Sequence, residues 1–207
     1  MIKIESRVLG PVATNCYLII NLDNNESIIV DPADSPESIY DMVVRSASKP
    51  QAILLTHGHF DHATGAGELA QLLHIKIYAQ EKEKETLENP QLNLSGWQGS
   101  ELVFYADEYL KDEQEIDLAG FHIRVFLTPG HTVGGCCYYF PYQNTLFSGD
   151  SLFQTSIGRT DFPKGSASQL IHAIREKLMP LPDETAVYTG HGDMTTIGTE
   201  RMYNPYL

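Results

Sequence analysis

Five of the eight histidines lie in short glycine-containing stretches that follow apolar segments. The densest stretch, THGHFDH at residues 56–62, holds three histidines and one aspartate directly after the apolar run 52–55. Imidazole and carboxylate groups are ligands of divalent metal ions. A single histidine is more simply explained as a polar loop residue, so a metal site is predicted only if other parts of the chain supply further ligands.

The same local unit recurs: an apolar segment, then Thr or Ser, then Gly, then a candidate ligand. It appears as ILLTHGH, VFLTPGH, TLFSGD and AVYTGH, and SIIVDP places Asp31 in an equivalent position. A strand that ends in a glycine turn holds the next side chain at the carboxyl edge of a sheet, where sites form in layered α/β folds. Four such ends facing one point would assemble seven side chains: His57, His59, Asp61, His62, His131, Asp150 and His191.

Seven ligands exceed the four of one tetrahedral zinc ion and suit two metal ions that share a bridging carboxylate. Gly58 disfavours a helix, so His57 and His59 can bind one ion while Asp61 and His62 turn toward the next. Burial of so many unpaired imidazoles and carboxylates would otherwise be costly. The remaining histidines fit ordinary helix or strand patterns and are interpreted as structural or solvated: His74, His122 and His172.

The elements that must position these residues alternate between strand and helix. We predict strands at 2–8, 15–21, 27–31, 51–56, 76–80, 101–106, 121–128, 136–141, 145–150 and 186–191. We predict helices at 35–47, 65–74, 81–90 (a charged surface helix), 166–178 and about 196–203. Two strand-rich blocks that each close with helices predict two packed sheets with helices outside. No linker divides the chain, so residues 1–207 are expected to form a single domain.

Composition narrows the class of protein. The chain has 207 residues, 42% of them hydrophobic, and a net charge of −13, which is typical of a globular protein that repels nucleic acids and anionic lipids. The N-terminus lacks a basic start and a long apolar segment, so a cytoplasmic protein with no membrane contact is expected.

Cys16, Cys136 and Cys137 are interpreted as structural thiols, with the adjacent pair on opposite faces of a strand. Trp97, in the expected loop 93–100, is either a pocket residue or a partly buried anchor.

The sequence resembles the metallo-β-lactamase superfamily, whose HxHxDH motif is matched by His57-Gly58-His59-Phe60-Asp61-His62. The similarity continues from ATNCYLI through TPGHT and SGD to TGHG, so it covers nearly the whole chain. It implies a four-layer αβ/βα sandwich. Within the superfamily the chain is most similar to glyoxalase II-like hydrolases, on the stretch LFQTSIGRTDFPKGS that follows Asp150.

The resemblance implies a ligand assignment. It implies that one set of three residues holds a first ion, that a second set of three holds a second ion, and that Asp150 bridges the two ions. The cofactors expected are two divalent metal ions, with zinc preferred and iron or manganese as alternatives. Two-zinc β-lactamases usually carry Cys where this chain has Asp150, which argues against antibiotic hydrolysis. The first set is His57, His59 and His131, and the second is Asp61, His62 and His191.

The implied activity is hydrolysis of a small hydroxyacyl thioester such as S-lactoylglutathione by a metal-bridging hydroxide. Asp61 and Asp150 are expected to orient the attack as catalytic residues, and Asp31 to hold a ligand histidine. A thiolate leaves without a proton, and no dedicated acid is apparent, so a thioester fits better than an amide. Arg159 and Lys164 either bind a substrate carboxylate or form surface salt bridges.

Several alternatives remain. Only 16 residues follow His191, so the helical domain with which larger glyoxalase II enzymes bind glutathione is expected to be missing, and the thiol carrier is open. A persulfide dioxygenase with one iron would use His57, His131 and Asp150. A non-catalytic metal-binding module would have a blocked site. A nucleic-acid phosphodiesterase is disfavoured by the acidic charge, and the oligomeric state is not determined.

Overall fold

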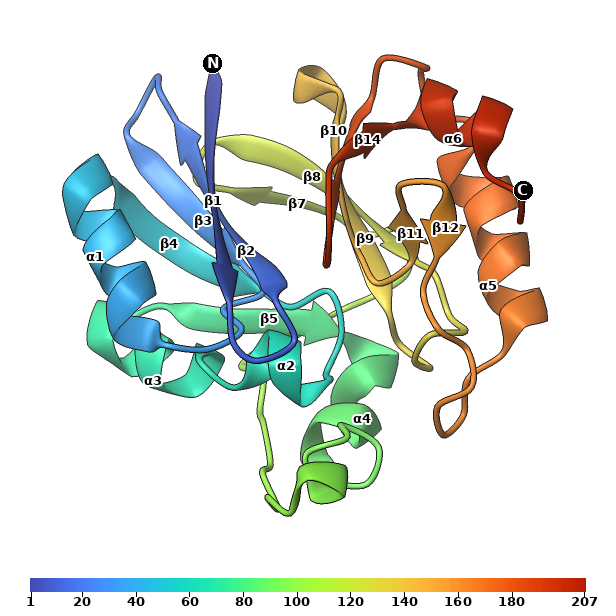
Figure 1. Cartoon of the computed structure of the whole chain (residues 1–207). Coiled ribbons are helices and arrows are strands. Elements are labelled where there is room, and N and C mark those ends of the chain that lie inside the picture. The colour runs from blue at the N-terminus through green and yellow to red at the C-terminus, as the bar shows by residue number, and fades with distance from the viewer.

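Two β-sheets pack face to face in the centre of the protein, and helices cover their outer faces (Figure 1). The computed structural model describes residues 1–207. The first sheet has the strand order β1 (Ile2–Leu9), β2 (Thr14–Asn21), β3 (Glu26–Val30), β4 (Lys49–Leu54), β5 (Lys76–Gln80) and β6 (Glu108–Leu110). The second has the order β14 (Thr195–Thr196), β13 (Ala186–Thr189), β10 (Thr145–Gly149), β9 (Cys136–Phe140), β8 (Phe121–Leu127) and β7 (Glu115–Leu118).

The helices complete a four-layer αβ/βα sandwich, which confirms the predicted fold class. On the first sheet lie α1 (Pro36–Ser46) and α3 (Ala66–Leu73), and on the second α5 (Ala167–Ala173) and α6 (Ile197–Tyr203). Helix α1 begins with Pro at its first position and buries Ile39, Met42 and Val43, which share one face at helical spacing. Smaller elements are α2 (Phe60–Ala63), α4 (Lys84–Glu88), β11 (Leu152–Phe153) and β12 (Ser156–Ile157).

The layer between the sheets is apolar and aromatic. Phe147 packs edge-to-face against both Tyr17 and Phe140 there, at centroid distances of 5.3 and 5.5 Å. Because both faces of each sheet are covered, β2 and β9 are buried at every position. Cys136 faces the layer between the sheets and Cys137 faces the α5 side, as opposite faces of one strand require, and both thiols are buried.

Some predicted elements differ from the structure. Residues 101–106 form no strand, and the edge strand is instead β6, which pairs parallel with β5. The predicted charged surface helix 81–90 is a 3-10 turn followed by α4, and it buries Glu83 and Leu87. The predicted helix 166–178 changes at Ile174 to a π-helical turn. Five short elements were not predicted from the sequence: α2, β7, β11, β12 and β14.

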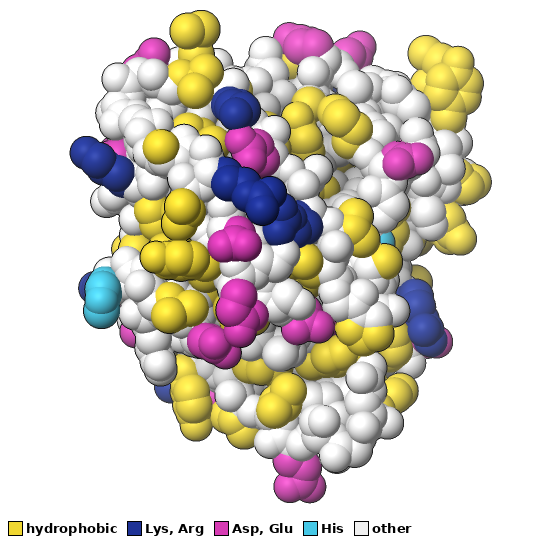
Figure 2. Space-filling model, turned by 60° about the vertical axis from the view of Figure 1, so that its left-hand side comes forward, with side chains coloured by type: hydrophobic (Ala, Val, Ile, Leu, Met, Phe, Trp, Pro, Cys, Tyr) yellow, Lys and Arg dark blue, Asp and Glu magenta, His cyan; other side chains and the backbone are white.

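The surface carries mixed charge on the face displayed in Figure 2, where Lys and Arg side chains lie next to Asp and Glu side chains and between hydrophobic groups. No helix is long and apolar enough to span a membrane.

Candidate metal centre

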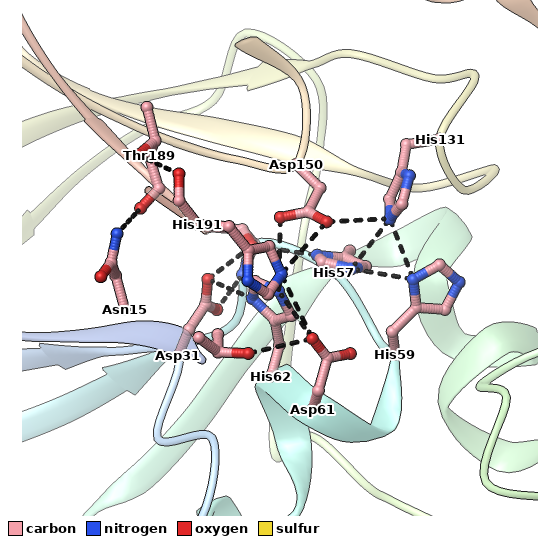
Figure 3. Close-up of polar contacts among 12 residues, drawn as sticks. Asn15, Asp31, His57, His59, Asp61, His62, His131, Asp150, Thr189 and His191 are labelled. Carbon is pink, nitrogen blue, oxygen red and sulfur yellow. Dashed lines mark hydrogen bonds and ion pairs between the residues drawn. The ribbon is translucent and has the colours of Figure 1, made fainter. Parts of the chain in front are cut away.

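The seven predicted ligands come together at one edge of the two sheets (Figure 3). Strand β4 leads into the stretch with His57 and His59, and α2 carries Asp61 and His62. The other three ligands follow three strands of the second sheet. Parallel pairing of β3 with β4 and of β10 with β13 places these strand ends at the same edge. The three are His131 after β8, Asp150 after β10 and His191 after β13.

Three histidines form the first group, called here the three-histidine set: His57, His59 and His131. Nε2 of His57 lies 3.0 Å from Nδ1 of His59, and Nε2 of His131 lies 3.2 and 2.9 Å from these two atoms. Imidazole nitrogens around a tetrahedral metal ion with bonds of 2.0–2.1 Å are about 3.3 Å apart. The three lone pairs therefore converge at a spacing close to that of metal ligands.

The second group, called here the mixed set, consists of Asp61, His62 and His191. Nε2 of His62 lies 3.4 Å from Nε2 of His191, and Oδ2 of Asp61 lies 3.5 and 3.3 Å from these nitrogens. Asp150 lies between the two sets, with Oδ2 3.4 Å from His131 and 3.6 Å from His191. One carboxylate therefore contacts ligands of both groups.

A divalent cation fits these residues. Oδ1 of Asp150 is buried and accepts no hydrogen bond, and the nearest charged partner is Nε2 of His62 at 3.3 Å, an arrangement that is costly for a carboxylate unless a cation binds there. The three nitrogens of the three-histidine set form three close pairs, and there are too few protons on them for every pair to be a hydrogen bond. The cluster is therefore suited to divalent metal ions rather than to a hydrogen-bonded network alone.

Hydrogen bonds on the far side of the rings select which nitrogen faces the cluster. Nδ1 of His62 donates to Asp31 at 2.9 Å, and Nδ1 of His131 donates to the carbonyl oxygen of Arg159 at 2.7 Å. Asp31 also accepts from the backbone N–H and the hydroxyl of Thr56, at 2.8 and 2.7 Å. Such outer partners fix the tautomer of a ligand histidine. The geometry thus places Asp31 in the outer position expected from the sequence.

The charges of the cluster agree with metal binding. Burial lowers the pKa values of His57, His59 and His131, so these rings are neutral and have a free lone pair. Burial alone would raise the pKa of Asp150, but the adjacent His62 and other histidines lower it to about 2. Burial likewise opposes a proton on His62, yet Asp61 and the two other carboxylates around it raise its pKa. The same carboxylates would favour a bound metal ion, which would take the place of the proton on Nε2 of His62, because Nδ1 of that ring donates to Asp31.

Glu83 was not predicted from the sequence, although it joins two ligand-bearing segments. It is fully buried, and Oε1 accepts the backbone N–H of Gly58 at 2.8 Å, between His57 and His59. Oε2 accepts the hydroxyl of Thr132 at 2.9 Å and the backbone N–H of Gly134 at 2.7 Å, just after His131. Glu83 therefore fixes the two segments of the three-histidine set relative to each other.

A surface cavity of about 510 Å³ leads to the cluster. Asp61, Asp150 and His191 reach it from the floor, and apolar side chains form much of its wall. The sequence left two roles open for Trp97, a pocket residue or a partly buried anchor. In the structure Trp97 lines the cavity and is 59% exposed.

The two predicted substrate-binding residues are placed differently. Arg159 lines the cavity and makes a two-pronged ion pair with Asp161 at 2.9 and 2.8 Å. Lys164 does not line the cavity and pairs with Glu85 at 2.6 Å. Only Arg159 is therefore placed to contact a molecule in the cavity.

Comparison with protein families identifies the fold family. The family model for the metallo-β-lactamase superfamily matches residues 9–191, which span all seven ligands. The chain belongs to this superfamily. The resemblance inferred from the HxHxDH motif is thereby confirmed.

Two relatives within the superfamily are similar over nearly their whole length. The probable metallo-hydrolase YqgX of Bacillus subtilis is 37% identical over 96% of this chain and 94% of its own. The hydroxyacylglutathione hydrolase GloC of Haemophilus influenzae is 38% identical over 93% of this chain and 92% of its own.

Two solved structures of the superfamily align closely with this chain. BLEG-1, described as a B3 metallo-β-lactamase, superposes with a TM-score of 0.94 at 40% identity, covering 99% of both chains. TTHA1623 in a di-iron-bound form superposes with a TM-score of 0.85 at 33% identity, covering 98% of this chain and 100% of its own.

One further side chain and one backbone carbonyl group support the mixed set. The hydroxyl of Thr14 donates to Oδ2 of Asp61 at 3.0 Å, and Nδ1 of His191 donates to the carbonyl oxygen of Ala13 at 3.3 Å. Ala13 ends the turn before β2 and Thr14 is the first residue of β2, so both lie far in the sequence from the ligands that they contact. Thr14 lies in the ATNCYLI stretch that contributed to the family resemblance, but only the fold shows that its hydroxyl contacts Asp61.

Proposed function

We propose that this chain is a metal-dependent thioesterase that hydrolyses hydroxyacyl thioesters such as S-lactoylglutathione. The observation that carries the proposal is the pair of adjacent ligand sets, joined by Asp150, at the floor of a cavity. The three-histidine set would hold one ion, the mixed set the other, and Asp150 would bridge them. Zinc is the metal we propose, and the di-iron form of TTHA1623 makes iron the main alternative.

A pair of divalent ions supplies a water activated at neutral pH and polarises the substrate carbonyl. The protein itself supplies orientation. The hydroxyl of Thr14 fixes one oxygen of Asp61, and both Asp61 and Asp150 face the cavity. Their carboxylates are thus placed to accept hydrogen bonds from the attacking water and to orient it.

The leaving group favours a thioester. The titratable residues that line the cavity are His59, Asp61, His131, Asp150 and His191, all in the ligand cluster, together with Arg159. An arginine does not give up its proton at neutral pH, so no separate acid is available to protonate an amine. A thiolate, whose conjugate acid has a pKa of about 8.5, leaves without such help. No Ser or Cys lines the cavity, so no side-chain nucleophile competes with water.

The test is the initial rate of S-lactoylglutathione hydrolysis by zinc-reconstituted protein. We expect turnover in the ordinary enzyme range of about 1–10³ s⁻¹, and its loss in His57→Ala. His172→Ala is the matched control, because His172 is an exposed histidine on α5 that pairs with Glu176 outside the cluster. Wild-type turnover no higher than that of His57→Ala would rule out the thioesterase.

A second candidate activity is β-lactam hydrolysis, which the likeness to BLEG-1 favours. The same three preparations, assayed with a chromogenic cephalosporin, separate the two activities. We expect a lower kcat/KM for the cephalosporin than for the thioester, because the lactam nitrogen must be protonated as it leaves.

The other two alternatives fit the site less well. A non-catalytic module was expected to have a blocked site, whereas ligand residues line a surface cavity here. A dioxygenase with one iron would need only His57, His131 and Asp150, whereas the mixed set is also assembled. Two metal ions per chain would support the hydrolase. One iron per chain, with oxygen consumed on addition of glutathione persulfide, would support the dioxygenase instead.

A further inference from the structure

The mouth of the cavity is aromatic. Phe162 lies edge-on to two ligand histidines, with ring centroids 5.5 Å from His59 and 5.9 Å from His131. Trp97 meets Phe162 at 6.1 Å. A molecule that reaches the cluster beside the three-histidine set therefore passes Trp97 and Phe162, called here the aromatic wall.

The loop that carries Trp97 is held in place beside the ligands. Asn93 is fully buried, and its side-chain amide donates to the carbonyl oxygens of Leu87 and Leu102 at 3.2 and 2.9 Å. The backbone carbonyl oxygen of Asn93 accepts a hydrogen bond from the backbone N–H of Phe60 at 2.8 Å, and Phe60 directly precedes Asp61. The position of Trp97 is thus tied to the start of α2 rather than left to a free loop, yet its indole remains exposed.

The mouth of the cavity has no unpaired Lys or Arg side chain that could bind an anionic ligand. Arg159 is the only Lys or Arg that lines the cavity, and Asp161 already neutralises it through two hydrogen bonds. Its guanidinium also lies over the ring of Phe162, 4.3 Å from the centroid. Apart from the metal ions that the ligand cluster would hold, a carboxylate on the ligand would therefore find no unpaired cation in the cavity.

We propose that the aromatic wall determines specificity by binding the apolar carbon next to the sulfur of the thiol carrier, and that carboxylates of the carrier contribute little. This inference rests on the proposed thioesterase function and names its substrate class as thioesters of carriers with an apolar, uncharged segment next to the sulfur. Glutathione then binds through its cysteine portion rather than through its two carboxylates.

The first test measures binding and needs no turnover. Trp97 is the only tryptophan in the chain, so its fluorescence reports directly on the aromatic wall. Ethyl, butyl and hexyl methyl sulfide are not hydrolysed, share the S-methyl group and differ only in the alkyl chain that stands for the carrier, and each is titrated into zinc-loaded and metal-free protein. We expect Kd to fall as the alkyl chain lengthens, by up to about fourfold for each buried methylene. A Kd independent of chain length would overturn the proposal.

The second test uses lactoyl thioesters of glutathione and of N-acetylcysteamine, which has no carboxylate. We expect similar kcat/KM values for both, and in Trp97→Ala a rise in KM for both of about tenfold, with kcat retained. Trp97→Phe should restore most of the loss, since a smaller aromatic ring keeps apolar contact. Tyr142→Ala is the matched control, because Tyr142 is an 80% exposed aromatic residue outside the cavity.

The outcomes separate this inference from the function on which it rests. A much lower kcat/KM for the N-acetylcysteamine thioester, with no effect of Trp97→Ala, would overturn the aromatic wall but leave the thioesterase intact. Absence of hydrolysis with either thioester, while the chain-length dependence of Kd persists, would overturn the thioesterase and still support apolar recognition. Equal thermal unfolding temperatures of the Trp97 variants and the wild type show that any loss is not one of folding.

Discussion

Asp150 is the residue at which the two ligand sets meet. Its Oδ2 contacts a histidine of each set, and its Oδ1 is buried without a hydrogen-bond partner. Asp150→Asn keeps the shape of the side chain but removes the negative charge that balances two cations. We expect metal content to fall below two ions per chain and metal affinity to drop by more than the 10–100-fold that loss of an outer partner causes.

Metal content measured by mass spectrometry and affinity measured by calorimetry check this prediction. Asp117→Asn is the matched control, since Asp117 is an exposed carboxylate on β7 that pairs with His122. Two tightly bound ions in Asp150→Asn would show that Asp150 is not the bridge.

Glu83 provides a second prediction at the scale of single residues. Glu83→Gln leaves one carbonyl oxygen where two carboxylate oxygens accept the N–H groups of Gly58 and Gly134. One buried N–H must lose its partner, which costs about 1–3 kcal/mol of stability. Because these glycines flank the three-histidine set, we expect metal affinity to fall by about 10–100-fold as well.

Glu200 is the matched control for Glu83. It is also fully buried and accepts from Thr155, Thr195 and Asn204, away from the ligand cluster. Thermal unfolding and zinc titration of both Gln variants separate the roles. Glu200→Gln should lose stability but retain zinc affinity. Equal zinc affinity in the two variants would mean that Glu83 serves stability alone.

At the scale of elements, the strand-end unit was predictable because it is local. An apolar run, a glycine and a ligand are adjacent in the sequence, and parallel strands bring such ends to one edge. The strand expected at 101–106 was wrong. Phe104 and Ala106 are apolar because they pack against the core between the first sheet and its helices, and they do not pair with another strand. Glu83 was hidden in EKEKETLENP, where charge indicated a solvated helix. Its buried partners lie 25 to 51 residues away in the sequence.

The turn after β13 allows a test of how tightly these elements meet. A Cβ on Gly190 would collide with Oδ1 of Asp150 and Cε1 of His62, so only glycine fits between these ligands. We expect Gly190→Ala to cost about 1–3 kcal/mol through overpacking and to reduce zinc binding. Gly67→Ala is the control, because nothing lies within 4 Å of a Cβ there in α3, and it should stabilise the protein by up to about 1 kcal/mol. Unchanged zinc binding in Gly190→Ala would show that the ligands can shift at no cost.

At the scale of the whole molecule, the metal centre joins the two halves of the sandwich. Residues 57–62 follow the first sheet, whereas His131, Asp150 and His191 follow strands of the second. Both ligand sets draw on both halves, so each bound ion would cross-link them at one edge, while the apolar layer joins them elsewhere. The fold therefore has its own core, but the site exists only when the sheets are docked.

Removal of the metal should consequently destabilise the folded protein as a unit. Free zinc at 1,000 times its Kd would stabilise the folded state by about 4.1 kcal/mol for each ion bound, which corresponds to about 8–16 °C in Tm per ion for a chain of this size. Differential scanning calorimetry with zinc and after chelation measures this difference. The double variant His57→Ala, His191→Ala removes a ligand from each set, so chelation should not change its Tm. A chelation shift that persists in the double variant would place the stabilising ion outside this cluster, because the remaining ligands could no longer complete either set.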